Sequence, residues 1–565
     1  MKITATIKLL RLFSWVWFLP LCIAIFKLWL TSHLPILAYY APHDQLRYVQ
    51  MASEISNFSP PFDYNHYVLM RQPGYAASIF LSYSLGFSLR FFQELLYIIT
   101  GFLLAWSIYS YYPKKNLVRL FLILYILAPI SYFINRQTLQ ECLYLPLTSV
   151  IISCLIHLIN LYSDPKKFIG WSIILGVALA WFWNTRPENV WILPSMGLAY
   201  ITIITKAIKG NLTLKTALYR TAYSIICLII PVFLLTISLK FATYAKYGIF
   251  QTNDLTAPGI KAAYSRILSV SPERWEYMVA VPEETRKEIY SVSPTFQKLS
   301  GYLENAGKNW FSFACNSYLR LCDDYSAGWF IWALRDAVAE VGEYKSATST
   351  ENFYAKIAEE IKSACDAKTI KCNNLNFSLP SVNVKIRSEY IKPFFNSIVK
   401  LSRRLIVKTS EINLTAGNAS TEIREAYYTR ITREPVNFLE QRDRSMNKFK
   451  DNLIILISEI YKFCFPPLLG LGVVGIVLQH ISNLKKSKQI INVELTIIWL
   501  MLLSVLTRLL IFAWIDATSY PILGGMRYLW PIFPLVLMLI AIGVSNFMTK
   551  FSLVFLKFIP ATNKE

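Results

Sequence analysis

Arginines and carboxylates recur in the short polar segments that separate the apolar stretches of this chain. An early segment, AYYAPHDQLRYVQ, holds His43, Asp44 and Arg47, and a later one, WNTRPENVW, holds Arg186 and Glu188. A guanidinium group is a planar, permanently charged fork that binds two phosphate oxygens. A carboxylate within hydrogen-bond reach of a hydroxyl can act as its general base. This combination predicts chemistry in which a hydroxyl attacks a group carried on a phosphate.

Charged groups at a membrane boundary are costly unless they are solvated or paired, so they are candidates for function. If the polar segments meet at one face of a membrane, their arginines would stabilise a departing lipid phosphate while an acceptor attacks C1 of the attached sugar. For any single arginine, the simpler interpretation is an interfacial anchor or a partner of its local acid. The residues expected to bind substrate are His43, Arg47, Arg71, Gln72, Tyr75, Arg136, Arg186, Glu188, Arg527 and Tyr528.

The elements that position these residues are predicted membrane helices. About 20 mostly apolar residues are needed to cross the hydrocarbon layer. The first stretch follows Lys2, Lys8 and Arg11 and lacks a small-residue cleavage site, so we expect a signal anchor. The predicted spans are 12–31, 91–111, 117–134, 140–162, 168–183, 189–205, 221–239, 452–478, 492–513 and 528–549.

The charges of the connecting segments orient these spans. Lysine and arginine gather in alternate loops, and such loops lie in the cytoplasm. Both termini are therefore expected to be cytoplasmic. The predicted parts are an N-terminal transmembrane module (1–239) with an exoplasmic catalytic loop of about 32–90, an exoplasmic soluble insert (240–451) and a C-terminal transmembrane module (452–565).

The insert is expected to be mainly helical, with two local disulfides. Cys315 and Cys322 have the same spacing as Cys365 and Cys372, and disulfides form in oxidising compartments. Four unrelated thiols are the alternative. The stretch 385–408 is basic and amphipathic, so it could lie along the bilayer surface or pack on its own domain with a solvated basic face.

The composition excludes several classes of protein. Only 16% of residues are charged and 54% are hydrophobic, which argues against a soluble enzyme, a coiled coil or a disordered chain. The net charge of +22 follows from the cytoplasmic loops and does not imply nucleic acid as a partner. The sequence has no P-loop, dinucleotide fingerprint or zinc-finger spacing. It is therefore that of a polytopic α-helical membrane protein with about ten transmembrane helices.

Two short motifs resemble those of a known family. Residues 71–76 read RQPGYA, close to an R-x-P-G-Y-P motif, with alanine in place of the final proline. Residues 527–531 read RYLWP, which fits an R-Y-x-x-P motif that opens a late span. With an aspartate soon after the first span, the chain resembles the GT-C fold glycosyltransferases. It is nearest the branch of protein O-mannosyltransferases and of aminoarabinose transferases that act on lipid A.

The resemblance implies an inverting glycosyl transfer from a polyprenyl-phosphate sugar to an exoplasmic glycan, lipid or protein. The family's catalytic aspartate falls on Asp44, and the acid of its second exoplasmic loop falls on Glu141. Asp44 would also suit the N-cap of a helix that starts at Gln45, and the two roles are compatible. The resemblance further implies a bacterial inner (plasma) membrane, with the insert in the periplasm.

Other functions compete with this hypothesis. A transporter or flippase for lipid-linked glycans would show paired repeats and charges at mid-membrane depth. A polymerase or ligase of surface polysaccharide would lack the early aspartate and the RQPGY segment, and a sensor displaying the insert would not need ten spans. A divalent metal is the cofactor that the family would allow. No metal site is assigned, because Asp44, Glu141 and His43 lack tight ligand spacing.

Overall fold

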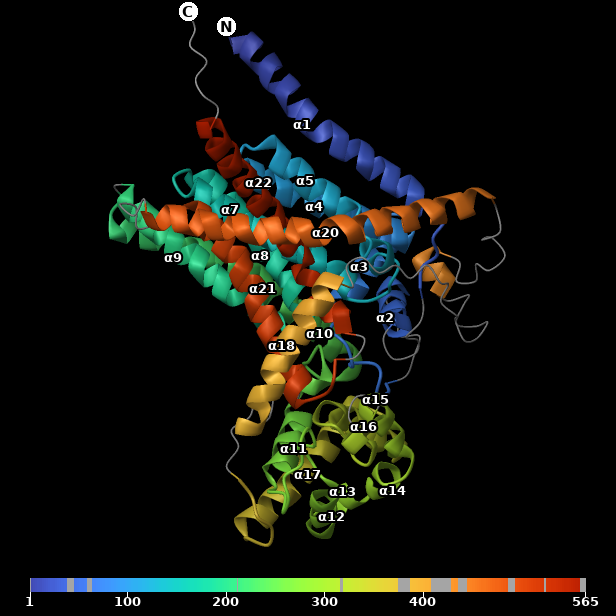
Figure 1. The fold of residues 1–565 in the computed structure, drawn as a ribbon. Helices are drawn as coiled ribbons and strands as arrows, with labels where there is room; N and C mark the ends of the chain where they lie inside the picture. The colour runs from blue at the N-terminus through green and yellow to red at the C-terminus, as the bar shows by residue number, and fades with distance from the viewer. Residues whose placement is uncertain are drawn as a thin grey trace, which may run out of the picture.

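The computed structural model describes residues 2–37, 45–57, 64–210, 212–315, 319–373, 387–407, 428–434, 445–485, 493–522 and 525–558. Within these ranges the chain is helical and contains no β-strand, only isolated bridges such as the one between Leu37 and Gln137. Figure 1 shows the start of α1 and the end of α22 at one end of the molecule, with the helices of the insert at the opposite end.

The apolar part of the fold consists of long helices. Eight described helices are long and apolar enough to cross a membrane, and α1 adds a shorter apolar segment at Val16–Thr31. The chain is thus a polytopic helical membrane protein. The long helices are α1 (Lys2–Thr31), α4 (Leu89–Tyr109), α7 (Glu141–Leu161), α8 (Pro165–Trp183), α9 (Leu193–Lys209), α10 (Leu214–Tyr247), α20 (Ser445–Lys485), α21 (Val493–Thr518) and α22 (Phe533–Phe558).

One predicted span is corrected. The stretch 117–134 was expected to be a single helix, but it divides into α5 (Lys115–Ile126) and the short α6 (Ser131–Ile134). Pro129 lies between them. Proline has no backbone N–H and disfavours helical backbone at the residue before it, so the first helix ends before the proline.

Shorter helices form the first loop and the insert. The first loop contains α2 (Gln45–Asn57) and α3 (Gly74–Ser84). The insert has its own hydrophobic core, separate from that of the membrane helices. Its main helices are α11 (Pro258–Ser269), α12 (Glu283–Val292), α13 (Pro294–Gln297), α14 (Ser300–Leu303), α15 (Ser312–Cys315), α16 (Ala327–Glu340), α17 (Ala347–Asp366) and α18 (Ile391–Val407).

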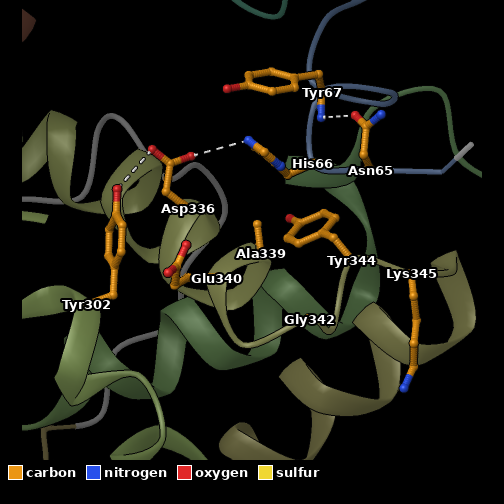
Figure 2. A pocket seen from close by; sticks show the side chains of 10 residues that line it. All are labelled: Asn65, His66, Tyr67, Tyr302, Asp336, Ala339, Glu340, Gly342, Tyr344 and Lys345. Atoms are coloured by element: carbon orange, nitrogen blue, oxygen red, sulfur yellow. Dashed lines mark hydrogen bonds and ion pairs between the residues drawn. The ribbon is translucent and has the colours of Figure 1, made fainter. Parts of the chain in front are cut away.

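The insert docks on the first loop. Helix α10 ends at Gly248, whose φ of 73° suits a residue without a Cβ. The chain then returns to the loop, where the Asp254 amide donates to the Leu69 carbonyl oxygen over 3.0 Å. Arg335 of α16 pairs with the Asp254 carboxylate and donates to the His66 carbonyl oxygen. The side chain of His66 faces Asp336 of the same helix (Figure 2). These bonds fix the loop residues that lead into α3.

Helix α18 packs against the C-terminal end of α21. Ser397 Oγ donates to Asp516 Oδ2 over 2.6 Å, and Lys400 Nζ lies 2.9 Å from Asp516 Oδ1. Its other face exposes Phe395 and Val399. The basic, amphipathic helix is thus held by a membrane-spanning helix and not by the insert's core.

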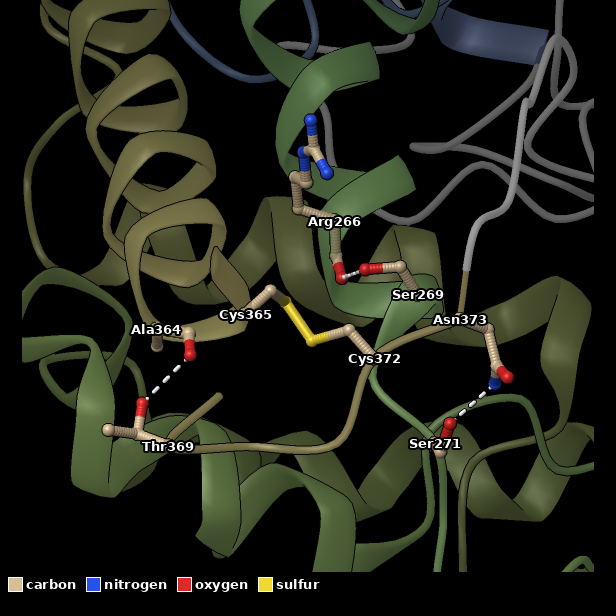
Figure 3. Close-up of a disulfide and its surroundings, with 8 residues drawn as sticks. All are labelled: Arg266, Ser269, Ser271, Ala364, Cys365, Thr369, Cys372 and Asn373. Carbon is tan, nitrogen blue, oxygen red and sulfur yellow. Dashed lines mark hydrogen bonds between the residues drawn. A yellow bond between two sulfur atoms is a disulfide. The ribbon is translucent and has the colours of Figure 1, made fainter. Parts of the chain in front are cut away.

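Two disulfides join the cysteines whose spacing suggested them, Cys315 to Cys322 and Cys365 to Cys372. The second ties the end of α17 to an extended segment that pairs with Val270 (Figure 3). Asn373 adds a 2.7 Å bond from its amide to the Ser269 carbonyl oxygen. This bridge therefore closes the insert's core near the end of α11.

Candidate active site

A close backbone contact joins the first loop to the turn after α8. The amide of Gly74 donates to the Asn184 carbonyl oxygen over 2.7 Å, and the Trp181 indole N–H donates to the Gly74 carbonyl oxygen over 2.7 Å. A Cβ at residue 74 would stand 2.6 Å from both the Asn184 oxygen and the Thr185 hydroxyl. Glycine is needed at this point of the RQPGY segment because the two backbones touch. The contact places α3 beside the turn that carries Arg186.

Arg186 is buried between two carboxylates from different elements. Its Nη1 lies 2.5 Å from Glu141 Oε1 at the start of α7, and its Nε donates to Glu188 Oε1 over 2.6 Å. Burial opposes the charge of Arg186, but Glu188 and Glu141 outweigh burial and raise the pKa of the guanidinium. Burial also disfavours the Glu188 carboxylate, yet Arg186 and Arg508 lower its pKa below the usual 4.5. Arg186 and Glu188 therefore stay charged at neutral pH.

A second buried guanidinium, that of Arg508 on α21, adjoins this triad. Its Nε donates to the Tyr528 carbonyl oxygen over 2.6 Å. Its plane lies 5.2 Å from the ring of Tyr144 and 5.0 Å from that of Trp191. Nη1 and Nη2 are both buried and have no hydrogen-bond partner among the described residues. Arg508 was not among the predicted site residues, although an arginine inside an apolar span is itself a signal of function.

The segment between α21 and α22 completes the cluster. The guanidinium of Arg186 lies 5.2 Å from the Tyr528 ring, and Arg527 Nη2 donates to the Tyr528 hydroxyl over 3.2 Å. The structure therefore brings together five predicted residues and one that was missed. We call these six the Arg186 cluster: Glu141, Arg186, Glu188, Arg508, Arg527 and Tyr528. Three guanidinium groups face two carboxylates, which leaves these side chains with a net charge of +1.

A buried network of amide and hydroxyl groups connects the start of α2 to the turn before Glu141. Gln45 Nε2 donates to Gln137 Oε1 over 2.7 Å, and the Tyr48 hydroxyl donates to Gln140 Oε1 over 2.8 Å. The Tyr75 hydroxyl donates to Gln93 Oε1 over 2.5 Å. Asp44 and His43 lie outside the described residues. Their neighbour Gln45 is nevertheless fixed to the segment that ends at Glu141.

The remaining predicted residues have other neighbours. Arg47 Nη2 donates to the Val68 carbonyl oxygen over 2.8 Å, which fastens α2 to the first loop. Arg136 Nε donates to the Pro35 carbonyl oxygen over 2.8 Å. Arg71 lies 5.1 Å from the ring of Trp332 in the insert, and Gln72 beside it is half-buried. These contacts hold the first loop in place.

The described residues offer no group of three or more histidine, cysteine, aspartate or glutamate side chains that could hold a metal ion. The ligands that the sequence analysis considered include His43 and Asp44, which lie outside those residues. No step of the chemistry below is assigned to a metal.

Comparison with known proteins adds a distant structural likeness. No protein-family model and no curated protein matches the chain. Among solved structures, ArnT from Cupriavidus metallidurans bound to undecaprenyl phosphate aligns with a TM-score of 0.33 and 11% identity, covering 94% of this chain and 78% of that chain. The apo state of the same protein gives a TM-score of 0.30 and 10% identity. No fold family, residue role, ligand or activity is inferred from this likeness.

Proposed function

We propose that this chain transfers a sugar from a polyprenyl-phosphate donor to an exoplasmic acceptor, with inversion at the anomeric carbon. The Arg186 cluster would hold the donor phosphate, and Asp44 would act as general base. In this topology both termini lie in the cytoplasm, and the insert lies outside, next to the first loop.

The observation that carries the proposal is the pair of unpartnered nitrogens of Arg508. Burying a charged group without a partner is strongly unfavourable. Arg186 already holds both Glu141 and Glu188, and Nη1 and Nη2 of Arg508 beside it have no hydrogen-bond partner among the described residues. A monoanionic or dianionic phosphate would fill the missing position, because a guanidinium fork binds two of its oxygens. Arg508, and not Arg186, is therefore the preferred phosphate ligand.

The reaction follows from this placement. The acceptor hydroxyl oxygen attacks C1 of the sugar, the bond between C1 and the phosphate oxygen breaks, and Asp44 takes the hydroxyl proton. Negative charge grows on the departing polyprenyl phosphate as that bond breaks. The buried guanidinium stabilises this charge more strongly than it would in water, since it is shielded from solvent. The nearby rings of Tyr144 and Trp191 provide that environment.

The test compares Arg508 with Arg186 in full-length protein in nanodiscs. Arg508→Met removes two buried nitrogens that have no hydrogen-bond partner among the described residues, so it should lower the Tm of the lipid-free protein less than Arg186→Met does, while lowering transfer by about 10²–10³-fold. Arg186→Met strips two carboxylates of their partner, so it should lower the Tm. If Arg508→Met retains normal transfer and normal affinity for undecaprenyl phosphate, the phosphate site is wrong.

The general base is tested separately. Asp44→Asn should lose about 10²–10⁴-fold in transfer without loss of undecaprenyl phosphate binding. Asp366→Asn, an exposed aspartate at the end of α17, is the matched control and should behave as the unsubstituted protein. Transfer is followed by mass spectrometry with a panel of labelled polyprenyl-phosphate sugars. Binding of every donor without any transfer, in folded protein, would favour a transporter of lipid-linked glycans.

A further inference from the structure

A cavity of about 490 Å³ opens where the first loop meets the insert. None of the predicted site residues lines it. Its walls come from three segments that are far apart in the sequence, and Figure 2 shows His66 and Tyr302 directed toward Asp336. The first loop contributes Tyr67, and the insert contributes Tyr302 and Tyr344. This volume lies within the range of about 300–1,000 Å³ that is typical of small-molecule sites.

Two carboxylates on α16 form the polar part of the cavity. Asp336 and Glu340 are four residues apart and therefore lie on one face of the helix. Asp336 Oδ2 accepts a 3.1 Å bond from the Trp310 indole N–H and a 3.4 Å bond from the Tyr302 hydroxyl. Its Oδ1 lies 3.8 Å from His66 Nε2. The carboxylate is thus held in place, yet about a quarter of its side chain (23%) remains exposed to the cavity side.

Glu340 is exposed and forms no ion pair with the described residues. The amide of Asn65 adds a hydrogen-bond donor at the rim. Carboxylates and amides placed around aromatic rings match a ligand with many hydroxyl groups, because the rings cover apolar C–H faces while the oxygens and nitrogens bind hydroxyls. A phosphate is disfavoured, because two carboxylates would repel it.

The first loop connects the cavity to the Arg186 cluster. His66 borders the cavity, and the segment that follows it runs through the RQPGY motif to Gly74, which touches the turn before Arg186. The same segment is clamped by Asp254 and Arg335 of the insert. A ligand in the cavity would therefore contact the loop that also borders the phosphate cluster.

We propose that the cavity between Tyr67, Tyr302 and Tyr344 binds a saccharide portion of the acceptor through Asp336 and Glu340. The role of this ligand as the acceptor rests on the proposed function, whereas its saccharide nature follows from the side chains of the cavity alone. The ligand is neutral or carries an amino group, and it spans one or two sugar rings.

Saccharide binding is measured on the full chain in nanodiscs by saturation-transfer NMR. The probes are glucose, mannose, galactose, N-acetylglucosamine and their disaccharides. At least one should bind with a Kd below about 10 mM. Glu340→Gln should weaken that binding at least about tenfold, and Tyr302→Phe should weaken it less. Glu359→Gln, an exposed glutamate on α17, is the matched control and should leave it unchanged.

The outcomes separate this inference from the proposed function. If the unsubstituted protein binds a saccharide but not undecaprenyl phosphate, and Glu340→Gln weakens the saccharide binding, the saccharide site is supported and the donor site is wrong. The reverse result, donor binding without any saccharide bound by folded protein, would overturn the cavity alone. Equal binding to the unsubstituted protein and to Glu340→Gln would also overturn it, as would preference for an acceptor peptide over every saccharide.

Discussion

Substituting Gly74 by alanine tests whether the first loop is positioned by its contact with the turn before Arg186. The added Cβ would lie 2.6 Å from the Asn184 carbonyl oxygen and 2.6 Å from the Thr185 hydroxyl. Ordinary contact begins at 3.4 Å, so the two segments must separate by about 0.8 Å, the difference between 3.4 and 2.6 Å. The Asn184 oxygen belongs to the backbone and cannot rotate away.

The magnitude follows from that geometry. Overpacking costs about 1–3 kcal/mol, and weakening the bond from the Gly74 amide to the Asn184 oxygen adds about 1 kcal/mol. The apparent Tm should therefore fall by roughly 2–3 °C, because the unfolding entropy of a chain of 565 residues is roughly 1.2 kcal/mol/K. A displacement approaching 1 Å at a reacting group lowers rates by about 10²-fold, and we expect a loss of transfer of that order.

The matched control is Gly170→Ala on α8, the helix that leads into the same turn. No atom lies within 4 Å of a Cβ at this position, so alanine should stabilise the helix by about 0.5–1 kcal/mol. Both variants are measured in nanodiscs by thermal unfolding and by sugar transfer. The reasoning is refuted if Gly74→Ala matches the unsubstituted protein in Tm and transfers within twofold of it.

Three further predictions concern charge and covalent links. Lys27 Nζ lies 2.8 Å from Glu94 Oε1 among the buried side chains of the membrane helices. Lys27→Met leaves the Glu94 carboxylate buried without this partner and should lower the free energy of unfolding by about 3 kcal/mol. The double variant Lys27→Met, Glu94→Gln should regain part of that loss, measured by thermal unfolding. Burial opposes the Glu188 charge, but the neighbouring guanidinium groups lower its pKa below 4.5. The stability that this carboxylate contributes is therefore fully present above its pKa in the unfolded chain, and it is lost as the pH falls through its pKa in the folded protein. Glu188→Gln should thus lower the Tm at pH 7, with the difference disappearing at acidic pH. Cys315→Ser removes the bridge to Cys322 and should cost about 2 kcal/mol, measured by thermal unfolding.

Local sequence signals determined the membrane character of this protein. Apolar length is a property of each segment by itself, so the class of polytopic helical membrane protein was predictable and is confirmed. The predicted span 117–134 was wrong because apolar composition alone does not show that the helix is interrupted near Pro129.

Residue types alone also indicated which side chains could form a site. Glu141, Arg186, Glu188, Arg527 and Tyr528 were chosen because arginines and acids recur in polar turns, and the structure brings these five together. The sequence could not rank them, because the charge available to a ligand depends on partners from other helices.

Tertiary structure decided that ranking and revealed the cavity. Arg186 is balanced by two acids, whereas Arg508 keeps two unpartnered nitrogens among the described residues; only the packing of α7, α8 and α21 produces that difference. In the same way, Tyr67 and Asp336 meet only because the insert folds back onto the first loop. Periodicity and composition describe neighbours along the chain, while pairing of buried charges depends on neighbours in space.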